Sequence, residues 1–382
     1  MGKPEIRFKG YTDEWEQRKL DDVVEFLDTM RKPLEGAKRA SGPYPYYGAS
    51  GIVDYVDGYL FDEELVLLSE DGANITDRNY PVCFLASGKY WVNNHAHVLR
   101  TKKENENNFI CNSLERKDYT QYNTGMAMPK LNKETCRKIP VLCPAFEEQQ
   151  KIGDYFRSLD HLITLHQRKC DGVKSLKKYM LQKMFPQNEQ KVPEIRFEGF
   201  TEAWEQRKLG NVFKEYSEKN HTELPALTII QGGGTVKRED SDRNLMYDKS
   251  NLSNYKMVRK DDFIVHLRSF EGGLEKSSSD GIISPAYHTF HGDVTDSRFY
   301  YPYFRSYEFI KHKLVPHVYG IRDGRSIDID GMKTIEIPYT SIEEQQKIGD
   351  YLESIDNLIT LHQQKCEELK KIKKFMLQKM FV

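Results

Sequence analysis

Apolar residues recur every three to four positions over residues 147–185 and again over residues 343–381, which is the spacing of an amphipathic helix with a heptad seam. At a rise of about 1.5 Å per residue, each stretch predicts a helix about 58 Å long, which suits a spacer between domains. Ser341 to Glu344 carries the S-x-x-E capping-box pattern at the start of the second helix. The predicted positions for helix pairing and partner docking are Ile152, Tyr155, Leu159, Leu162, His166, Leu176 and Met180, and then Ile348, Tyr351, Ile355, Leu358, His362, Ile372 and Met376.

The two helical stretches belong to an internal duplication. Residues 4–20 return at 193–209 with 13 of 17 positions identical, and residues 147–185 return at 343–381 with 28 of 39 identical. A period near 190 is too long for a solenoid, so a domain-sized unit is repeated in tandem. The stretches between, 27–143 and 216–339, do not align. Shared blocks predict one kind of partner bound twice, whereas unlike inserts predict two different ligands.

The duplication also predicts how the chain is organised. Two equivalent helices related by a pseudo-twofold axis pair antiparallel, and we interpret His166 and His362 as polar residues that set their register rather than as a metal pair. Strand-like runs at 65–68 and 262–266 predict an α+β class. We therefore expect two mixed α/β domains separated by two long helices that form an antiparallel coiled coil. The expected ranges are 1–146 for the first domain, 147–186 for the first helix, 187–342 for the second domain with its linker 187–192, and 343–382 for the second helix.

Composition narrows the class of protein. The chain has 57 Lys+Arg and 58 Asp+Glu, and the two inserts are separately near neutral, which argues against coating nucleic acid by bulk charge but does not exclude a basic face. No apolar run reaches the roughly 20 residues that span a bilayer, and no signal-peptide core is present, so we expect a cytoplasmic protein without membrane contact. The six cysteines form no C-x-x-C pair, which predicts reduced structural thiols and no zinc ribbon.

Three motifs resemble the specificity subunits of type I restriction-modification systems. They are the frame Trp-Glu-Gln-Arg-Lys-Leu, the helix start Pro-x-x-Glu-Glu-Gln-Gln-Lys-Ile at 144–152 and the closing Met-Leu-Gln-Lys-Met-Phe, and the resemblance covers the entire chain. It implies two target-recognition domains at opposite ends of the helix pair, each reading one half of a split, asymmetric site in double-stranded DNA. The helices then set the unread gap and dock two adenine-N6 methyltransferase subunits, and two restriction subunits complete the nuclease. The resemblance also implies no cofactor in this chain, with S-adenosylmethionine, ATP and Mg²⁺ used by the partner subunits.

The sequence itself is consistent with a non-catalytic role. It has no Asn-Pro-Pro-Tyr or Asp-Pro-Pro-Tyr methyltransferase box, no P-loop and no Rossmann fingerprint. Glu115 and Lys117 have the E-x-K shape of a nuclease site but lack an upstream Pro-Asp partner. We predict no catalytic residue and no metal site. Two alternatives stay open: a coiled-coil adaptor that binds two different proteins, which the duplication fits equally well, and an enzyme, which the missing motifs disfavour.

Candidate DNA contacts follow from the chemistry of nucleic acids, since Lys and Arg suit phosphates while Arg, Lys, Asn and Gln read bases. The first insert offers a basic Gly- and Pro-rich turn, a strand-like run that ends in amides, and a loop before the helix similar to one that the family directs towards DNA. His95 and His97 are too few for a metal site, so we expect them to form hydrogen bonds within the domain. The second insert offers a glycine turn, a Lys- and Ser-rich loop and an Arg-containing loop before its helix. The candidates are Arg31, Lys32, Lys38, Arg39, Tyr46, Lys89, Asn93, Asn94, Tyr122, Asn123 and Lys130, and then Lys237, Arg238, Arg268, Lys276, Tyr319, Arg322 and Arg325.

Overall fold

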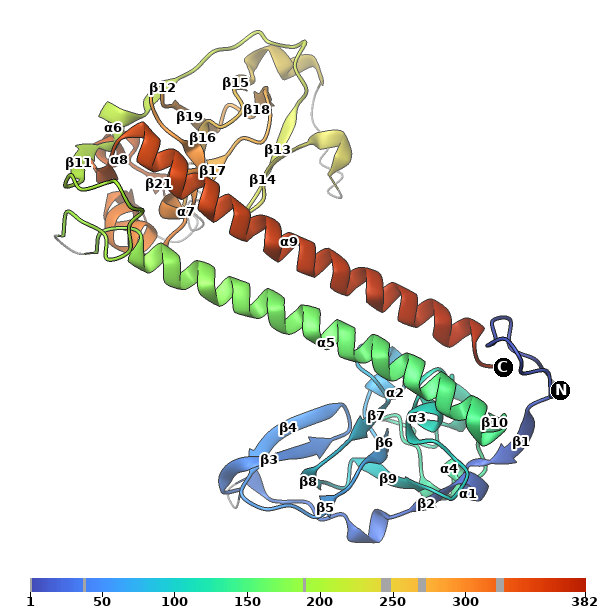
Figure 1. Cartoon of the computed structure of the whole chain (residues 1–382). Helices are drawn as coiled ribbons and strands as arrows, with labels where there is room; N and C mark the ends of the chain where they lie inside the picture. The colour runs from blue at the N-terminus through green and yellow to red at the C-terminus, as the bar shows by residue number, and fades with distance from the viewer. Residues whose placement is uncertain (1, 37–38, 188–189, 242–248, 267–272, 321–325) are drawn as a thin grey trace. The chain divides into compact units, whose positions relative to one another are not determined.

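The computed structural model describes residues 2–36, 39–187, 190–241, 249–266, 273–320 and 326–382, and the chain forms two units. One unit combines residues 1–168 with 362–382, and the other is residues 169–361. Each unit holds one α/β domain and a half of each long helix, α5 (Phe146–Lys183) and α9 (Ile342–Lys379) (Figure 1). Each helix begins one residue before its expected range and ends three residues before the end of that range. Among the described residues, no helix has both the length and the apolar character to cross a bilayer.

The domain of the first unit is built on two four-stranded sheets. One has the order β2-β9-β6-β7 and the other the order β4-β3-β8-β5, with β3 and β8 parallel and the other described pairs antiparallel. The predicted apolar run at 65–68 is the fully buried strand β6, because a strand covered on both faces is apolar throughout. The elements are β1 (Glu16–Lys19), α1 (Leu20–Val23), β2 (Val24–Phe26), β3 (Ser41–Gly48), β4 (Gly51–Val56), β5 (Phe61–Asp62), β6 (Leu65–Ser69), α2 (Asn74–Asp77), β7 (Cys83–Ala86), β8 (Lys89–Val92), β9 (Ala96–Thr101), α3 (Asn107–Glu115), α4 (Lys133–Cys136) and β10 (Pro140–Cys143).

The second domain repeats the first sheet although its sequence does not align. Its sheet order β12-β19-β16-β17 matches β2-β9-β6-β7, and the pair β11–β22 matches β1–β10, which joins the entry and exit of the first domain. The two inserts therefore share a common α/β core. The elements are β11 (Glu205–Lys208), α6 (Leu209–Val212), β12 (Lys214–Tyr216), β13 (Leu227–Ile230), β14 (Gly234–Lys237), β15 (Lys256–Val258), β16 (Phe263–His266), β17 (Glu275–Lys276), β18 (Gly281–Ile283), β19 (Tyr287–His291), α7 (Ser297–Phe304), β20 (Val318–Tyr319), β21 (Ser326–Ile327), α8 (Ile329–Lys333) and β22 (Glu336–Tyr339).

The repeated sequence blocks meet one another at the start of each long helix. Arg7 donates two hydrogen bonds of 2.7 Å to the buried carboxylate of Glu148. Arg196 donates the equivalent bonds to Glu344, at 2.6 and 2.8 Å. A buried carboxylate is tolerated when a guanidinium pairs with it in this two-bond geometry, which explains why both blocks recur together.

Gln149 and Gln345, which follow these two glutamates in the repeat, bind each domain to the start of its long helix. The side chain of Gln149 accepts a hydrogen bond from the backbone N–H of Glu106 and donates one to the carbonyl of Pro144. Gln345 makes the equivalent pair with the N–H of Asp296 and the carbonyl of Thr340. Gln149 and Gln345 can therefore bind two unlike domains, because the partners of their side chains are backbone groups.

Each long helix ends in the aromatic core of a domain. Phe381, after α9, packs in the first unit against Trp15 and Phe109, with ring centroids 6.2 and 5.3 Å apart. Phe185, after α5, occupies the equivalent place in the second unit beside Trp204 and Phe299. The Met-Phe ending of the repeat is therefore a core element, and each domain is completed by the helix of the other repeat.

Within each unit the two half-helices run antiparallel, as predicted. In the first unit Nδ1 of His166 lies 3.1 Å from Nδ1 of His362, and Lys373 pairs with Asp160. In the second unit Lys177 pairs with Asp356 at 2.5 Å. The predicted seam divides by exposure: Ile152, Leu159, Ile348 and Ile355 are buried, Tyr155, Met180, Tyr351 and Met376 are half-buried, and Leu162, Leu176, Leu358 and Ile372 are exposed.

Candidate nucleic-acid interface

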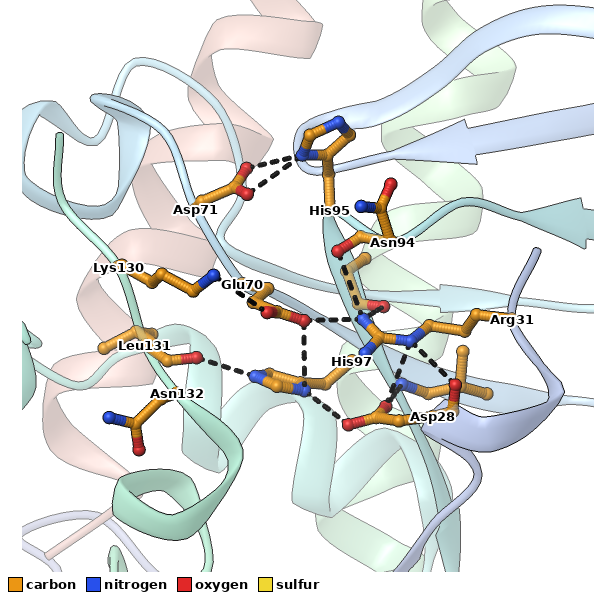
Figure 2. A network of polar contacts seen from close by, with 12 residues as sticks. Asp28, Arg31, Glu70, Asp71, Asn94, His95, His97, Lys130, Leu131 and Asn132 are labelled. Carbon is orange, nitrogen blue, oxygen red and sulfur yellow. Dashed lines mark hydrogen bonds and ion pairs between the residues drawn. The ribbon is translucent and has the colours of Figure 1, made fainter. Parts of the chain in front are cut away.

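A buried histidine lies at the centre of a polar network in the first domain (Figure 2). His97, in β9, is 1% exposed, and its Nδ1 lies 2.7 Å from a carboxylate oxygen of Asp28 while its Nε2 lies 2.7 Å from the carbonyl oxygen of Leu131. Because both neighbours are acceptors, both ring nitrogens carry a proton and the ring is an imidazolium. Burial alone would lower the pKa of His97, but the hydrogen bonds and charge interactions with Asp28 and Cys136 together outweigh burial and raise the pKa to about 10.

Arg31 and Glu70 extend this network to two further segments. The guanidinium of Arg31 lies 2.7 Å from a carboxylate oxygen of Glu70 and donates to the carbonyl of Ala96 at 2.8 Å. Glu70 also pairs with Lys130 at 3.4 Å, and its carbonyl accepts from the N–H of Leu131 at 2.7 Å. Three cations therefore surround the two carboxylates of Asp28 and Glu70, which leaves the cluster with a positive balance.

The network joins the segments on which the sequence places its candidate DNA contacts. His95 lies beside it, half-exposed, with Nδ1 2.8 Å from Asp71. The backbone of residues 28–31, the turn 93–95 and the loop 123–132 are all bonded to members of the network (Figure 2). His95 and His97 form hydrogen bonds within the domain, as the sequence predicts, and they do so through separate partners.

Four predicted contacts of the first domain point inward instead. Arg31 has only 12% of its side chain exposed and is held by the ion pairs above. Tyr46 is buried, with its hydroxyl accepting from the N–H of Leu34, and Asn93 is buried against its own turn. Tyr122 packs on the apolar core. Direct contact with DNA stays a prediction for these four residues; in this structure Arg31, Tyr46 and Asn93 are held within the domain by the bonds just described.

The other described candidates of the first domain reach its surface. The Arg39 guanidinium lies over the ring of Tyr46, and the Lys89 amine lies over the ring of Tyr59 at 4.8 Å, so both cations are placed by aromatic rings. The Asn123 side chain closes a loop, and Lys38 lies outside the described residues. Contact with DNA stays a prediction for the exposed side chains Lys32, Asn94 and Lys130.

The second domain presents its glycine turn on a hairpin. Strands β13 and β14 flank the turn, and the N–H of Gly232 donates to Glu275 at 2.7 Å, which itself pairs with Tyr301 and Arg305 of the α7 region. Lys276 pairs with Asp261 at 3.2 Å. The exposed candidates Lys237 and Tyr319 stay predictions, as does Arg238, whose guanidinium lies over the ring of Tyr255. Arg268, Arg322 and Arg325 lie outside the described residues.

Sequence reasoning missed the acidic members of these clusters. Asp28 lies in a short 3-10 helix, Glu70 directly follows β6, and Glu275 lies in β17. Their partners are distant in sequence, so neither spacing nor periodicity marks these acids. Glu115 has a structural role: its carboxylate accepts from the N–H groups of Val82 and Cys83, both at 2.8 Å. Within the described part of the chain, no three His, Cys, Asp or Glu side chains are grouped to hold a metal ion.

Known proteins share the sequence pattern of this chain. The model of the type I restriction modification DNA specificity domain matches residues 12–175 and 201–371, once in each half. A type I restriction enzyme specificity subunit of Methanocaldococcus jannaschii is 23% identical over 95% of this chain and 91% of its own length. A protein of Haemophilus influenzae described as such a subunit is 37% identical over 38% of this chain, a match that spans only 36% of that relative.

The fold is also found in a solved structure. The crystal structure of the S subunit of a type I restriction-modification system from M. genitalium superposes with a TM-score of 0.69 at 14% identity, covering 100% of this chain and 99% of that one. This likeness confirms the predicted class of two mixed α/β domains with long helices. Because the family model matches both halves and most of the chain, the protein belongs to the type I restriction-modification DNA specificity family.

Proposed function

We propose that this chain is the non-catalytic subunit that chooses the DNA sequence for a type I restriction-modification complex, with each domain reading one half of a bipartite duplex site. The observation that carries the proposal is a repeated frame that holds two domains of one fold but different surfaces. The first domain offers the Asn94 and Lys130 surface above an ion network, whereas the second offers a hairpin with a glycine turn that ends at Lys237. Two unlike readers on one frame fit an asymmetric, split site.

The helices offer a matching pair of docking surfaces. In the first unit Leu162, Ile372 and Phe375 are exposed, and the repeat places Leu358, Leu176 and Tyr179 at the equivalent positions in the second unit, also exposed. Helical apolar side chains left in water mark a protein interaction site, and a repeated set indicates the same partner bound twice. We infer that each unit docks one adenine-N6 methyltransferase subunit, and that two restriction subunits join the assembly.

The chemistry of the complex is assigned to these partners. We propose that they use S-adenosylmethionine for methyl transfer and ATP with Mg²⁺ for restriction, while this chain supplies recognition alone. With 57 basic and 58 acidic residues, the isolated chain has no bulk positive field, so it is expected to bind DNA modestly. Its binding is also expected to be sensitive to salt, because individual Lys and Arg side chains contact phosphates. Closure of the partners around the duplex supplies the remaining affinity.

The test is a map of N6-methyladenine in host DNA with and without this gene. We expect deletion to remove methylation from one split motif. Replacing residues 216–339 by the second insert of another specificity subunit is expected to change one half of that motif only, and replacing residues 27–143 is the matched control, expected to change the other half.

Two results would contradict the proposal. An unchanged methylation map after deletion of an expressed gene would favour the adaptor alternative. A change in both halves of the motif after one replacement would contradict the assignment of one domain to one half-site.

A further inference from the structure

The segment from Gly125 to Pro129 in the first domain is a closed, preformed loop. The side-chain oxygen of Asn123 accepts from the N–H groups of Gly125 and Lys130, at 2.9 and 2.8 Å. The N–H and the hydroxyl of Thr124 both donate to the carbonyl of Lys130, at 2.8 and 3.0 Å. Three of these hydrogen bonds hold the two ends of the loop together, and the fourth, from Gly125 to Asn123, closes the turn at its start.

Three further features restrict this loop. A Cβ at Gly125 would overlap the carbonyl oxygen of Met128, so the chain folds back on itself more tightly than any other residue permits. Pro129 fixes its own φ, and its carbonyl accepts from the N–H of Gly72 at 3.0 Å. Beneath the loop, the carbonyl of Leu131 accepts from the buried ring of His97. The loop is therefore ordered by its base and not by a core of its own.

The tip of the loop is apolar and lies in water. Met126, Ala127 and Met128 are consecutive and all exposed, with Met126 fully exposed and Met128 61% exposed. A run of exposed apolar residues on a rigid loop contributes nothing to the core, and such a run is retained where it has a binding role. Methionine suits this role because its unbranched thioether adapts to irregular apolar surfaces.

The surroundings indicate nucleic acid as the ligand. Lys130 borders the tip, while Asn94 and His95 are exposed on the neighbouring turn, joined to it by the same network (Figure 2). Cations suit phosphates and amides suit base edges, so an apolar tip among them suits the parts of a base that make no hydrogen bonds.

We propose that Met126 and Met128 form an apolar finger that packs against DNA bases in the half-site read by the first domain. The proposal rests on the function proposed above. Two apolar base surfaces are available to such a finger: the methyl group of thymine in the major groove, and the face of a base at a step that the finger unstacks. Both require a projecting apolar group on a rigid support, which the loop supplies.

The experiment uses the full chain in complex with its methyltransferase subunits and a duplex that carries the mapped motif. The double variant Met126→Ala/Met128→Ala removes the finger, Met126→Leu/Met128→Leu keeps it apolar, and Val294→Ala removes an exposed apolar side chain of the second domain as a matched control. We expect the alanine variant to weaken DNA binding at least tenfold, with the leucine variant and the control close to wild type. Co-purification of the methyltransferase subunits is expected to remain unchanged.

The salt dependence separates an apolar contact from a phosphate contact. The alanine variant should leave the slope of log K against log [salt] unchanged, because an apolar contact releases no counterion. Lys130→Ala should reduce that slope by about one. Replacing thymine by uracil at single positions tests the methyl contact, and increased fluorescence of 2-aminopurine at single positions reports an unstacked step; a positive result in either assay supports the finger.

Three results would overturn the inference. Unchanged affinity of the alanine variant would remove the role of the tip. Loss of the methyltransferase subunits from the purified complex would show that the tip binds protein. Absence of methylation and of specific DNA binding by the wild-type complex would reject the proposed function itself, which is distinguishable because the wild type and not only the variant fails.

Discussion

Replacing His97 by phenylalanine is expected to destabilise the first unit strongly. The ring keeps a similar volume, but Asp28 and the carbonyl of Leu131 both lose their hydrogen-bond donors. Breaking a buried charged pair by removing one partner typically costs about 3–5 kcal/mol of unfolding free energy. The raised pKa of His97 gives a second value for the same free energy, since a rise from 6.5 to about 10 corresponds to about 5 kcal/mol. The two routes agree in magnitude.

The pH dependence of this effect has a definite sign. Because the folded pKa of His97 is raised above its unfolded value, its contribution is complete below pH 6.5, declines as pH rises, and is lost above about pH 10. The difference in unfolding free energy between wild type and His97→Phe should therefore shrink across this interval. For a unit of this size, about 5 kcal/mol corresponds to about 10–20 °C in the melting temperature near neutral pH.

Hydrogen–deuterium exchange measured on individual peptides tests this prediction, because it reports the protection of the two units separately. Protection should fall in β6 and β9 of the variant, while peptides of residues 169–361 keep their protection. His95→Phe is the control, since its pair with Asp71 is half-exposed and exposed pairs are worth about 0–1 kcal/mol. The reasoning would be refuted if His97→Phe lowered stability no more than His95→Phe, or if the difference from wild type stayed constant between pH 6 and 10.

Two further predictions concern packing. Gly153→Ala should lower the unfolding free energy of the first unit by about 1–3 kcal/mol, because the added Cβ would overlap the Glu106 carboxylate that caps α3. Gly349→Ala should lower the unfolding free energy less, because the nearest neighbour of its added Cβ, Cβ of Arg298, lies 3.1 Å away. Urea denaturation followed separately in each unit checks the difference, and equal losses would contradict it. All six cysteines are buried and free, so a thiol reagent should react slowly with the native chain and with six equivalents after denaturation; rapid native reaction would contradict this burial.

The helical frame was predictable because its signal is local and repeated. A heptad pattern, a capping box and a second copy predicted the bounds of α5 and α9 to within three residues. The common sheet order of the two inserts was not visible, because strands of two to eight residues tolerate many sequences that bury the same faces. The network was missed for a related reason: His97 meets Asp28 and Leu131 across 69 and 34 positions, a proximity that only the fold creates.

The discontinuity of the first unit sets the order in which the protein matures. Residues 169–361 form a contiguous unit, whereas the first unit needs residues 362–382, which are translated only after the whole of the second unit. The first domain is thus translated early but waits for Phe381 to fill its core. A chain that stops between residues 361 and 381 therefore contains the whole second unit but lacks part of the core of the first domain.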